Sequence, residues 1–525
     1  MRQNMTRKNS IDSPIKAIGD SATMSGIKPE YQAETHATAE LGIKLVTILA
    51  CLHLLIVAGI IINNLSYPTI LDNSEATNAF TVYAAGVGMR LYGPTSPFEN
   101  QPFYPPLAYN IMGVVSSWFG YDIRSMRLVA AVFSTAAFVL LGMTVYRITR
   151  NKYLSLIGAA LFAGAPVGNW YCYIHPDAFH ICFAVLAVYL LAKDMSLRWS
   201  TVFAVILALF ASFWSKQTGL AYLAAGLLYF WIKDWRKGIA ATIFASLLFA
   251  GFAGYYINQP ESSFLFMIFT NAANDPIIWK GIFNPVIFPE ILGRYGIMCA
   301  IVIAGIIGLG WKWKNWIRPE YVFLGAGAVD ALLGSLKYGS GIMHALFFYG
   351  MLIVCGMYFL NKFRQENNLS LPLMLGLLIV QSVVLSVHEY SSGIITSEDD
   401  KRYRQILDIM ATPGKKVHYI AQPFYNIVVG TQAHPAIGHG CRRRGVYDRS
   451  LYPEVLRKFF ESDPFDIIIA DVPLEDNSWL LYERINKNYV PVMEIPADTR
   501  RIGGNTLRNR KIVFYRKDLV GPRPQ

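Results

Sequence analysis

Long apolar runs alternate with short polar segments between about residues 41 and 390, and this pattern sets the predicted architecture. Most runs approach the roughly 17–25 residues that an α-helix needs to cross a bilayer. The pattern predicts about eleven membrane-spanning helices. They fall near residues 43–62, 126–146, 154–170, 178–191, 201–214, 220–232, 239–257, 291–309, 321–336, 342–360 and 371–387.

The segments outside these runs have a different character. Residues 1–40 are polar and aperiodic, which predicts a disordered cytosolic tail. Within the membrane module (41–390), two long insertions are predicted on the outer side, at 63–125 and 258–290, and the first is expected to hold surface-lying helices. Residues 391–525 read as a small α/β domain. Its strands are predicted near 415–421, 466–470, 489–494 and 511–515, and its helices near 403–410 and 453–460.

The placement of lysine and arginine predicts the orientation. Cationic residues concentrate in alternate connecting segments, and the segments between them hold few. The pattern places the N-terminus in the cytosol and the C-terminal domain outside the cytoplasm, in a multi-pass protein of the plasma (inner) membrane. The formal net charge of +12 is therefore mostly a topology signal, and no nucleic-acid partner is expected. The fold class is an α-helical polytopic membrane protein with a small extracytoplasmic α/β domain.

Composition supports this fold class. Hydrophobic residues make up 54% of the 525 residues and charged residues 16%, against about 25% charged in an ordinary soluble domain. Ionisable side chains are thus scarce, and several polar side chains, most of them ionisable, fall on the predicted outer side, mainly at helix ends. These residues are Asp72, Glu75, Arg90, Tyr104, His175, Asp177, Lys216, Gln217, Lys337 and His344.

Each of these residues also has a structural interpretation, and both readings remain open. Asp177 follows Pro176, so it can stabilise the positive end of the next helix. Lys216 can be an ordinary interfacial lysine, and His344 a packed helix histidine. Asp330 lies within an apolar run, where a carboxylate defaults to a functional hypothesis. A set of ionisable groups on one membrane face favours an active site.

Two other functional classes are compatible with the sequence. In a lipid or solute transporter, Asp330, His53 and His180 would line a path, but mid-membrane polar residues are sparse and no internal repeat is visible. A non-catalytic membrane scaffold with an outer binding domain is the other alternative. Both are less favoured than an enzyme.

The order of motifs resembles the GT-C fold glycosyltransferases that use polyprenyl-phosphate sugars, the group of protein O-mannosyltransferases and aminoarabinose transferases, in its bacterial branch. The resemblance covers roughly residues 43–390. The family pattern is an acidic motif after the first span, then glycine, a spacer and Leu-Tyr, a Pro-Pro-Leu element, the entry into the second span, an Arg-Pro-Asp-Ala element, a Thr-Lys-Gln-Thr element and a late Gly-Ser-containing element. In this chain these are Asp72-Asn73-Ser74-Glu75, Gly88-Met89-Arg90-Leu91-Tyr92, Tyr104-Pro105-Pro106-Leu107, Gly120-Tyr121 with Arg127-Leu128, His175-Pro176-Asp177-Ala178, Ser215-Lys216-Gln217-Thr218 and the stretch from Lys337 to His344.

The resemblance implies a membrane glycosyltransferase that moves a sugar from a polyprenyl-phosphate donor to an acceptor hydroxyl, with inversion at the anomeric carbon. The acceptor is a glycan, lipid or protein, and membrane lipids surround the enzyme. Such a transfer needs a base for the acceptor proton and cations for the leaving phosphate. The implied catalytic residues are Asp72 and Glu75, the implied phosphate-binding residues are Lys216, Lys337, His344 and Arg90, and the implied substrate-binding residues are Tyr104, His175, Asp177 and Gln217.

The acidic motif departs from the adjacent Asp-Glu pair of many family members. Glu75 takes the Glu place and Ser74 the Asp place, while Asp72 lies two residues earlier. The sequence therefore favours Asp72 as the base without excluding Glu75, which is second choice or a partner that orients Asp72. No cofactor is required by the sequence, and no ligand spacing marks a metal site. A divalent metal between these carboxylates and the phosphate remains compatible with it.

Overall fold

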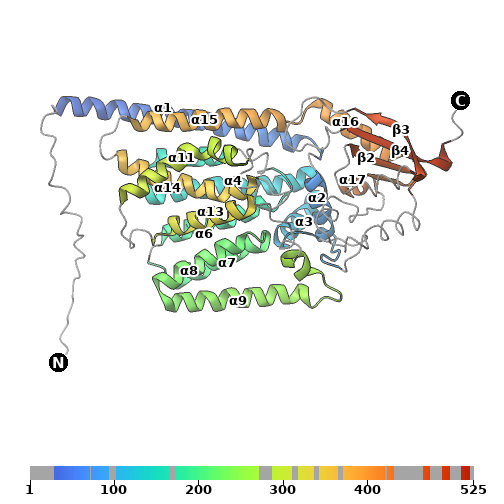
Figure 1. Cartoon of the computed structure of the whole chain (residues 1–525), viewed down its shortest axis with the longest axis horizontal. Helices are drawn as coiled ribbons and strands as arrows, with labels where there is room; N and C mark the ends of the chain where they lie inside the picture. The colour runs from blue at the N-terminus through green and yellow to red at the C-terminus, as the bar shows by residue number, and fades with distance from the viewer. Residues whose placement is uncertain are drawn as a thin grey trace.

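The protein is a bundle of roughly parallel helices with a small sheet domain at one end (Figure 1). The computed structural model describes residues 29–70, 73–93, 102–165, 172–194, 196–270, 287–309, 317–335, 342–364, 370–419, 423–430, 465–472, 487–496 and 510–520. Helices close together in the chain pack side by side: α4 (Ile123–Thr149) on α5 (Lys152–Ala163) and α6 (Asp177–Lys193), α6 on α7 (Trp199–Ser215), and α7 on α8 (Gly219–Lys233). The long first helix, α1 (Pro29–Ser66), lies along α15 (Ser370–Gly393) and α5.

The helical elements follow the apolar pattern of the sequence. The helices of the bundle are α1 (Pro29–Ser66), α2 (Asn73–Gly86), α3 (Leu107–Phe119), α4 (Ile123–Thr149), α5 (Lys152–Ala163), α6 (Asp177–Lys193), α7 (Trp199–Ser215), α8 (Gly219–Lys233), α9 (Trp235–Ile257), α11 (Ile287–Leu309), α13 (Pro319–Ser335), α14 (Leu346–Arg364) and α15 (Ser370–Gly393). A π-helical turn, η2 (Phe266–Thr270), and a 3-10 turn, η4 (Ile342–Ala345), lie between them.

Each of the eleven predicted apolar runs falls on a helix. Helices α2 and α3 lie within the first predicted insertion, which confirms helical structure there. Two boundaries differ most. Helix α1 begins at Pro29, so the segment predicted as a disordered tail up to residue 40 is helical from Pro29 onward. Helix α5 ends at Ala163, while the predicted run extends to residue 170, of which 166–170 lie outside the described residues. Gly164 and Pro166 follow, and a residue before proline disfavours helical backbone. The number of membrane crossings remains a prediction.

Among the described residues, four helical segments are long and apolar enough to cross a membrane: Glu40–Ser66, Ile123–Thr149, Trp235–Ile257 and Met343–Lys362. Several shorter apolar helices accompany them, including α5, α7 and α8. Large apolar side chains such as Leu55, Leu207 and Leu247 are more than half exposed on the outside of the bundle. In water this would be costly, so these surfaces fit a lipid environment. The prediction of a multi-pass membrane protein is confirmed at this level.

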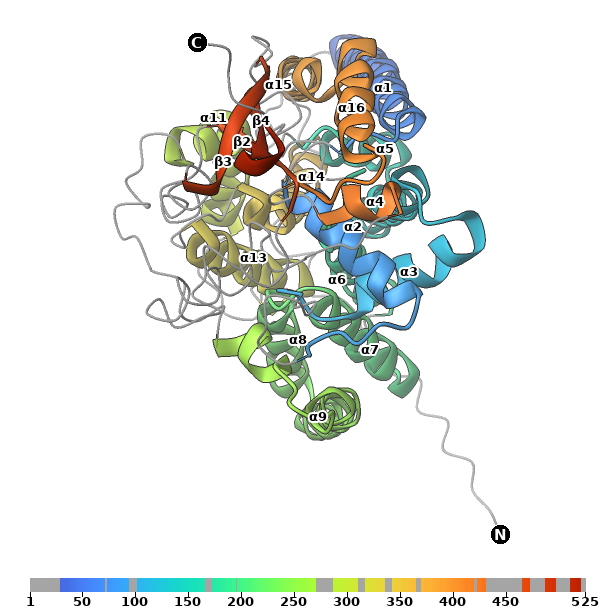
Figure 2. The same cartoon turned by 90° about the vertical axis from the view of Figure 1, so that its right-hand side faces the viewer.

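The C-terminal region holds the sheet domain seen at the front of Figure 2. Its elements are α16 (Ser397–Met410), β1 (Val417–Tyr419), α17 (Pro423–Val428), β2 (Ile467–Val472), β3 (Tyr489–Ile495), β4 (Arg510–Arg516) and the 3-10 turn η7 (Lys517–Leu519). The strand order is β1-β2-β4-β3, with β1 parallel to β2 and the other neighbours antiparallel. All four predicted strands are present, and the helix predicted at 453–460 lies outside the described residues.

Helices α2 and α3 join the bundle to this domain. Helix α2 packs against α3 and α17, and α3 packs against α4 and α7. A buried cluster runs through this junction and contains Ile70, Tyr109, Ile174, Tyr403 and Ile467. The segment before α2, the start of α6 and the sheet domain therefore pack together at one end of the bundle.

Candidate active site

An ion pair between Glu75 and Arg127 anchors the chain that leaves α1. Both side chains are fully buried. Arg127 Nε donates to Glu75 Oε1, and Nη2 donates to Oε2, each at 2.7 Å. The remaining N–H groups donate to the carbonyl oxygens of Asn64 (2.9 Å), Tyr67 (3.2 Å) and Thr69 (2.5 Å). All five guanidinium donors are thus used.

This arrangement ties α4 to the segment that precedes Asp72. Three carbonyl oxygens between residues 64 and 69 point at one guanidinium, so the segment is fixed along its length. Asp72 itself lies outside the described residues, but Ile70 is buried and Asn73 begins α2. Through Arg127, Glu75 therefore helps to fix the segment between residues 64 and 69.

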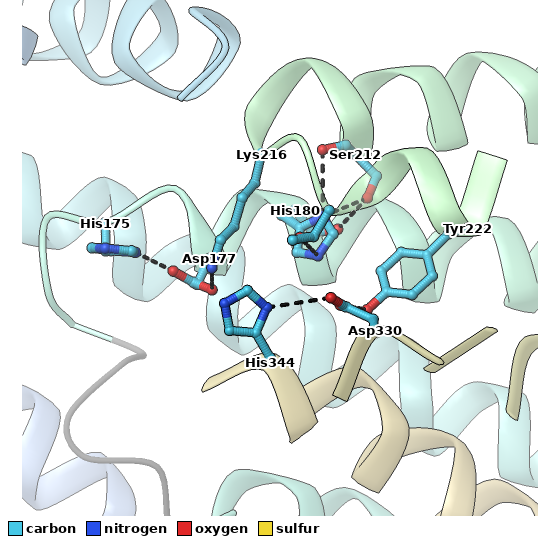
Figure 3. Close-up of polar contacts among 9 residues, drawn as sticks. His175, Asp177, His180, Ser212, Lys216, Tyr222, Asp330 and His344 are labelled. Carbon is cyan, nitrogen blue, oxygen red and sulfur yellow. Dashed lines mark hydrogen bonds and ion pairs between the residues drawn. The ribbon is translucent and has the colours of Figure 1, made fainter. Parts of the chain in front are cut away.

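A second cluster joins the start of α6 to the end of α7. Lys216 Nζ donates to Asp177 Oδ1 at 2.6 Å, and His175 Nδ1 contacts Asp177 Oδ2. Both Lys216 and Asp177 are buried. The two motifs around His175 and Lys216 are about forty residues apart in sequence, and the packing of α6 on α7 brings them together. Figure 3 shows Asp177 between His175 and Lys216.

The turn between α7 and α8 fixes Lys216. Helix α7 ends at Ser215, and Lys216 has extended backbone. Gly219 N donates to Lys216 O at 2.9 Å, which closes a tight turn. A Cβ on Gly219 would lie 2.4 Å from Phe213 N, so only glycine allows this close approach.

Tyr104 and Gln217 complete this cluster. Lys216 Nζ lies 5.7 Å from the Tyr104 ring centroid, and the Tyr104 and His175 rings meet edge to face. Gln217 Nε2 donates to Phe103 O at 3.2 Å. Burial lowers the pKa of Lys216, but the Asp177 carboxylate, with smaller effects of Tyr104 and Asp330, raises it more, so the net pKa is above the usual value. Lys216 is therefore a fixed cation with further N–H groups to offer.

Arg90 lies near the same end of the bundle. It directly precedes Leu91 and Tyr92, which belong to a buried cluster with Phe213 and Trp214 at the end of α7. Within the described part of the chain, its Nε and Nη2 atoms are buried without a hydrogen-bond partner. Buried polar nitrogen atoms are normally paired, so these two suit an anionic ligand.

A third group surrounds Asp330, beside the Lys216 cluster (Figure 3). Tyr222 donates to Asp330 Oδ2 at 2.5 Å, and His344 Nδ1 lies 3.2 Å from Oδ1. His180 stacks on the Tyr222 ring. These residues come from α13, α8, η4 and α6, so four elements converge here. The sequence marked Asp330 and His344 but gave no sign of Tyr222.

Of the ten predicted site residues, five are joined in one cluster by contacts: Tyr104, His175, Asp177, Lys216 and Gln217. Glu75 instead pairs with Arg127, and His344 with Asp330. Asp72 and Lys337 lie outside the described residues. Arg127 was the main omission. It appeared in the sequence only as part of the Arg127-Leu128 motif, and its partner Glu75 lies 52 residues away. Within the described ranges, no group of three or more His, Cys, Asp or Glu side chains is arranged to hold a metal ion.

The comparisons with known proteins agree with this architecture. Residues 103–256 match the sequence model of the dolichyl-phosphate-mannose-protein mannosyltransferase family. That stretch includes Tyr104, His175, Asp177, Lys216 and Gln217. No curated protein sequence matches the chain.

Solved structures with a similar fold include those of two proteins. The apo crystal structure of ArnT from Cupriavidus metallidurans matches with a TM-score of 0.56 and 12% identity, over 91% of this chain and 99% of that one. The same protein bound to undecaprenyl phosphate gives 0.53 and 12%, over 90% and 99%. The Archaeoglobus fulgidus oligosaccharyltransferase in complex with Zn and sulfate gives 0.53 and 12%, over 87% and 73%.

These matches confirm the predicted class. The chain has the GT-C fold of the glycosyltransferases that use polyprenyl-phosphate sugars, as the ArnT likeness and the mannosyltransferase match together indicate.

Proposed function

We propose that the protein is a membrane glycosyltransferase that moves a sugar from a polyprenyl-phosphate donor to an acceptor hydroxyl at the outer membrane face, with inversion. The observation that carries this proposal is the buried Lys216–Asp177 pair at the junction of α6, α7 and α3. A lysine held there by one of its three N–H groups can direct the others at a lipid phosphate. The ArnT structure with undecaprenyl phosphate supports this class of donor.

The leaving phosphate needs several cations, because negative charge develops on it as the sugar departs. We assign this role to Lys216, Arg90 and His344, and keep Lys337 as a further candidate. Tyr104, His175, Asp177 and Gln217 form the surrounding wall and contact the sugar or its phosphate. Asp177 has a second task, since it orients both Lys216 and His175.

The transfer is a single displacement. The acceptor oxygen forms a bond to the anomeric carbon from the face opposite the phosphate, and the bond between that carbon and the phosphate oxygen breaks. The acceptor proton passes to the Asp72 carboxylate, and the bond electrons leave with the polyprenyl phosphate. Glu75 holds the segment of Asp72 through Arg127.

Exchange of Lys216 for methionine is expected to weaken the binding of undecaprenyl phosphate by about 10–100-fold, since a charge-assisted hydrogen bond contributes about 1.5–3 kcal/mol. The measurement is a titration of the purified full chain in detergent with undecaprenyl phosphate. The readout is the rise in melting temperature that binding causes. Lys193→Met is the matched control, because Lys193 is exposed at the other end of α6. Equal affinities of the two variants, or no binding by the wild type, would refute the donor site.

The acceptor side is assigned to a cavity between the bundle and the C-terminal domain. The cavity has a volume of about 450 Å³ and is lined by Pro68, Tyr121, Asp122, Tyr403 and Leu407, among others. Pro68 belongs to the segment that Arg127 fixes ahead of Asp72. Aromatic rings beside charged groups suit a polar acceptor such as a glycan.

A bulky side chain in this cavity is expected to weaken acceptor binding without affecting donor binding. Leu407→Trp fills the space, so the acceptor KM should rise roughly tenfold, about 1.4 kcal/mol, while undecaprenyl phosphate binds as before. Asp408→Trp is the control, because Asp408 is exposed and is not among the lining residues. An unchanged acceptor KM in Leu407→Trp would place the acceptor elsewhere.

A further inference from the structure

The position of the His344 ring is set by Asp330 and Gly334, and Tyr222 supports Asp330 from behind. His344 Nδ1 lies 3.2 Å from Asp330 Oδ1. A Cβ on Gly334 would lie 2.2 Å from His344 Cγ, so the ring occupies the space that glycine leaves on α13. Tyr222 holds the second oxygen of Asp330 at 2.5 Å. Any change at these positions therefore acts on the direction of the imidazole.

Tyr222 is itself immobilised. It is fully buried, and its ring centroid lies 5.1 Å from that of His180 and 4.1 Å from that of Phe347. His180 is bound in turn to Ser212 Oγ at 2.8 Å and to Thr218 Oγ1 at 3.2 Å. The Asp330 carboxylate is thus presented to His344 by a rigid support from α6, α7 and α8.

The contact with Asp330 favours one arrangement of the ring protons. Because an ionised carboxylate only accepts hydrogen bonds, we assign the donor role in this contact to Nδ1 of His344. Nε2 on the other side of the ring remains for a ligand. In Figure 3 the imidazole lies between Asp330 and the Asp177–Lys216 pair, and the charge of Asp330 acts on Lys216.

We propose that Asp330 is a positioning residue for sugar transfer: with Tyr222 and Gly334 it holds His344 so that Nε2–H donates to the departing lipid phosphate beside Lys216. A carboxylate on one ring nitrogen fixes the tautomer and stabilises the imidazolium whose other nitrogen does the work. His344 donates a hydrogen bond and keeps its proton. The inference rests on the proposed glycosyltransferase function.

The sharpest test moves the ring without removing a polar group. Gly334→Ala is expected to displace His344 and lower kcat about 10–100-fold with little change in donor KM, because small misplacements of a catalytic group have effects of this size. Gly325→Ala is the matched control on the same helix, where an added Cβ meets nothing within 4 Å. Wild-type kcat in Gly334→Ala would overturn the proposal.

A double-mutant cycle separates positioning from a general structural role. Asp330→Asn and His344→Gln should each lower kcat by a similar factor, and the double variant should be no slower than His344→Gln, because Asp330 acts through His344. Tyr222→Phe should lower kcat by part of this factor. Tyr229→Phe, on the same helix, should leave kcat unchanged. If the kcat of the double variant fell by the product of the two single factors, Asp330 and His344 would act independently, which would contradict the proposal.

Nuclear magnetic resonance of the full chain with 15N-labelled histidine tests the geometry without any turnover. His344, assigned by comparison with His344→Gln, is expected to be protonated on Nδ1, and Asp330→Asn should change that signal. If the wild type shows this signal but transfers no sugar, the proposed function is refuted, while the arrangement of His344 and Asp330 stands. A wild type that transfers sugar while His344 lacks the Nδ1 proton would refute the positioning alone.

Discussion

Replacing Asp72 by asparagine is expected to lower kcat for sugar transfer by about 10²–10⁴-fold and to leave the affinity for undecaprenyl phosphate unchanged. A base that accepts the acceptor proton acts only in the transition state, so its loss appears in kcat and not in donor binding. Ile70, two residues before Asp72, is buried, and α2 begins at Asn73, directly after Asp72. The measurement is transfer by the purified full chain from a panel of undecaprenyl-phosphate-linked hexoses and pentoses.

Glu261→Gln is the control for this experiment. Glu261 is an exposed carboxylate in the turn after α9, and its loss should leave kcat unchanged. Glu75→Gln discriminates between the two acids. If Asp72→Asn retains full activity while Glu75→Gln is inactive and stably folded, Glu75 is the base and our assignment is reversed.

Arg127→Met is expected to reduce the free energy of unfolding by about 3–5 kcal/mol, the cost of leaving a buried charge unpaired. Glu75 would lose both of its 2.7 Å contacts, and three carbonyl oxygens would lose their donors. Sugar transfer should fall as well, since the segment before Asp72 would lose its anchor. Thermal unfolding in detergent measures the first effect and single-turnover transfer the second.

The same helix provides a matched arginine. Arg124 forms an ion pair with Asp122 at 2.6 Å, but its side chain is 53% exposed. Exposed pairs contribute about 0–1 kcal/mol, so Arg124→Met should change stability little. If Arg124→Met and Arg127→Met lower the free energy of unfolding equally, the buried Arg127–Glu75 pair has no special role in stability.

The sequence predicted the elements because their signals are local. Apolar runs identified the helices, and alternating or β-branched stretches identified β1 to β4. The beginning of α16 also had a local signal that the prediction did not use. Thr396 and Asp399 form a capping box that starts the helix at Ser397, six residues before the predicted start at Tyr403.

The partners of the candidate site residues could not be predicted, because they come from distant segments. The contact between Tyr222 and Asp330 joins residues 108 apart in the chain. Nothing around Tyr222 distinguishes it from Tyr229 on the same apolar helix, and only the packing of α8 on α13 selects it. Lys216 and Asp177 were predicted individually from their positions at helix ends, but not as an ion pair.

Helices α7 and α8 have a consequence for the surrounding bilayer. They contain 17 and 15 residues, so at 1.5 Å per residue they extend about 26 and 22 Å, less than the roughly 30 Å thickness of a hydrocarbon core. In the proposed topology both helices cross the bilayer, and lipid next to such short helices can thin to match them. Lys216, in the turn that joins them, is then expected below the ordinary headgroup level, and a lipid phosphate would reach it by descending into a local depression.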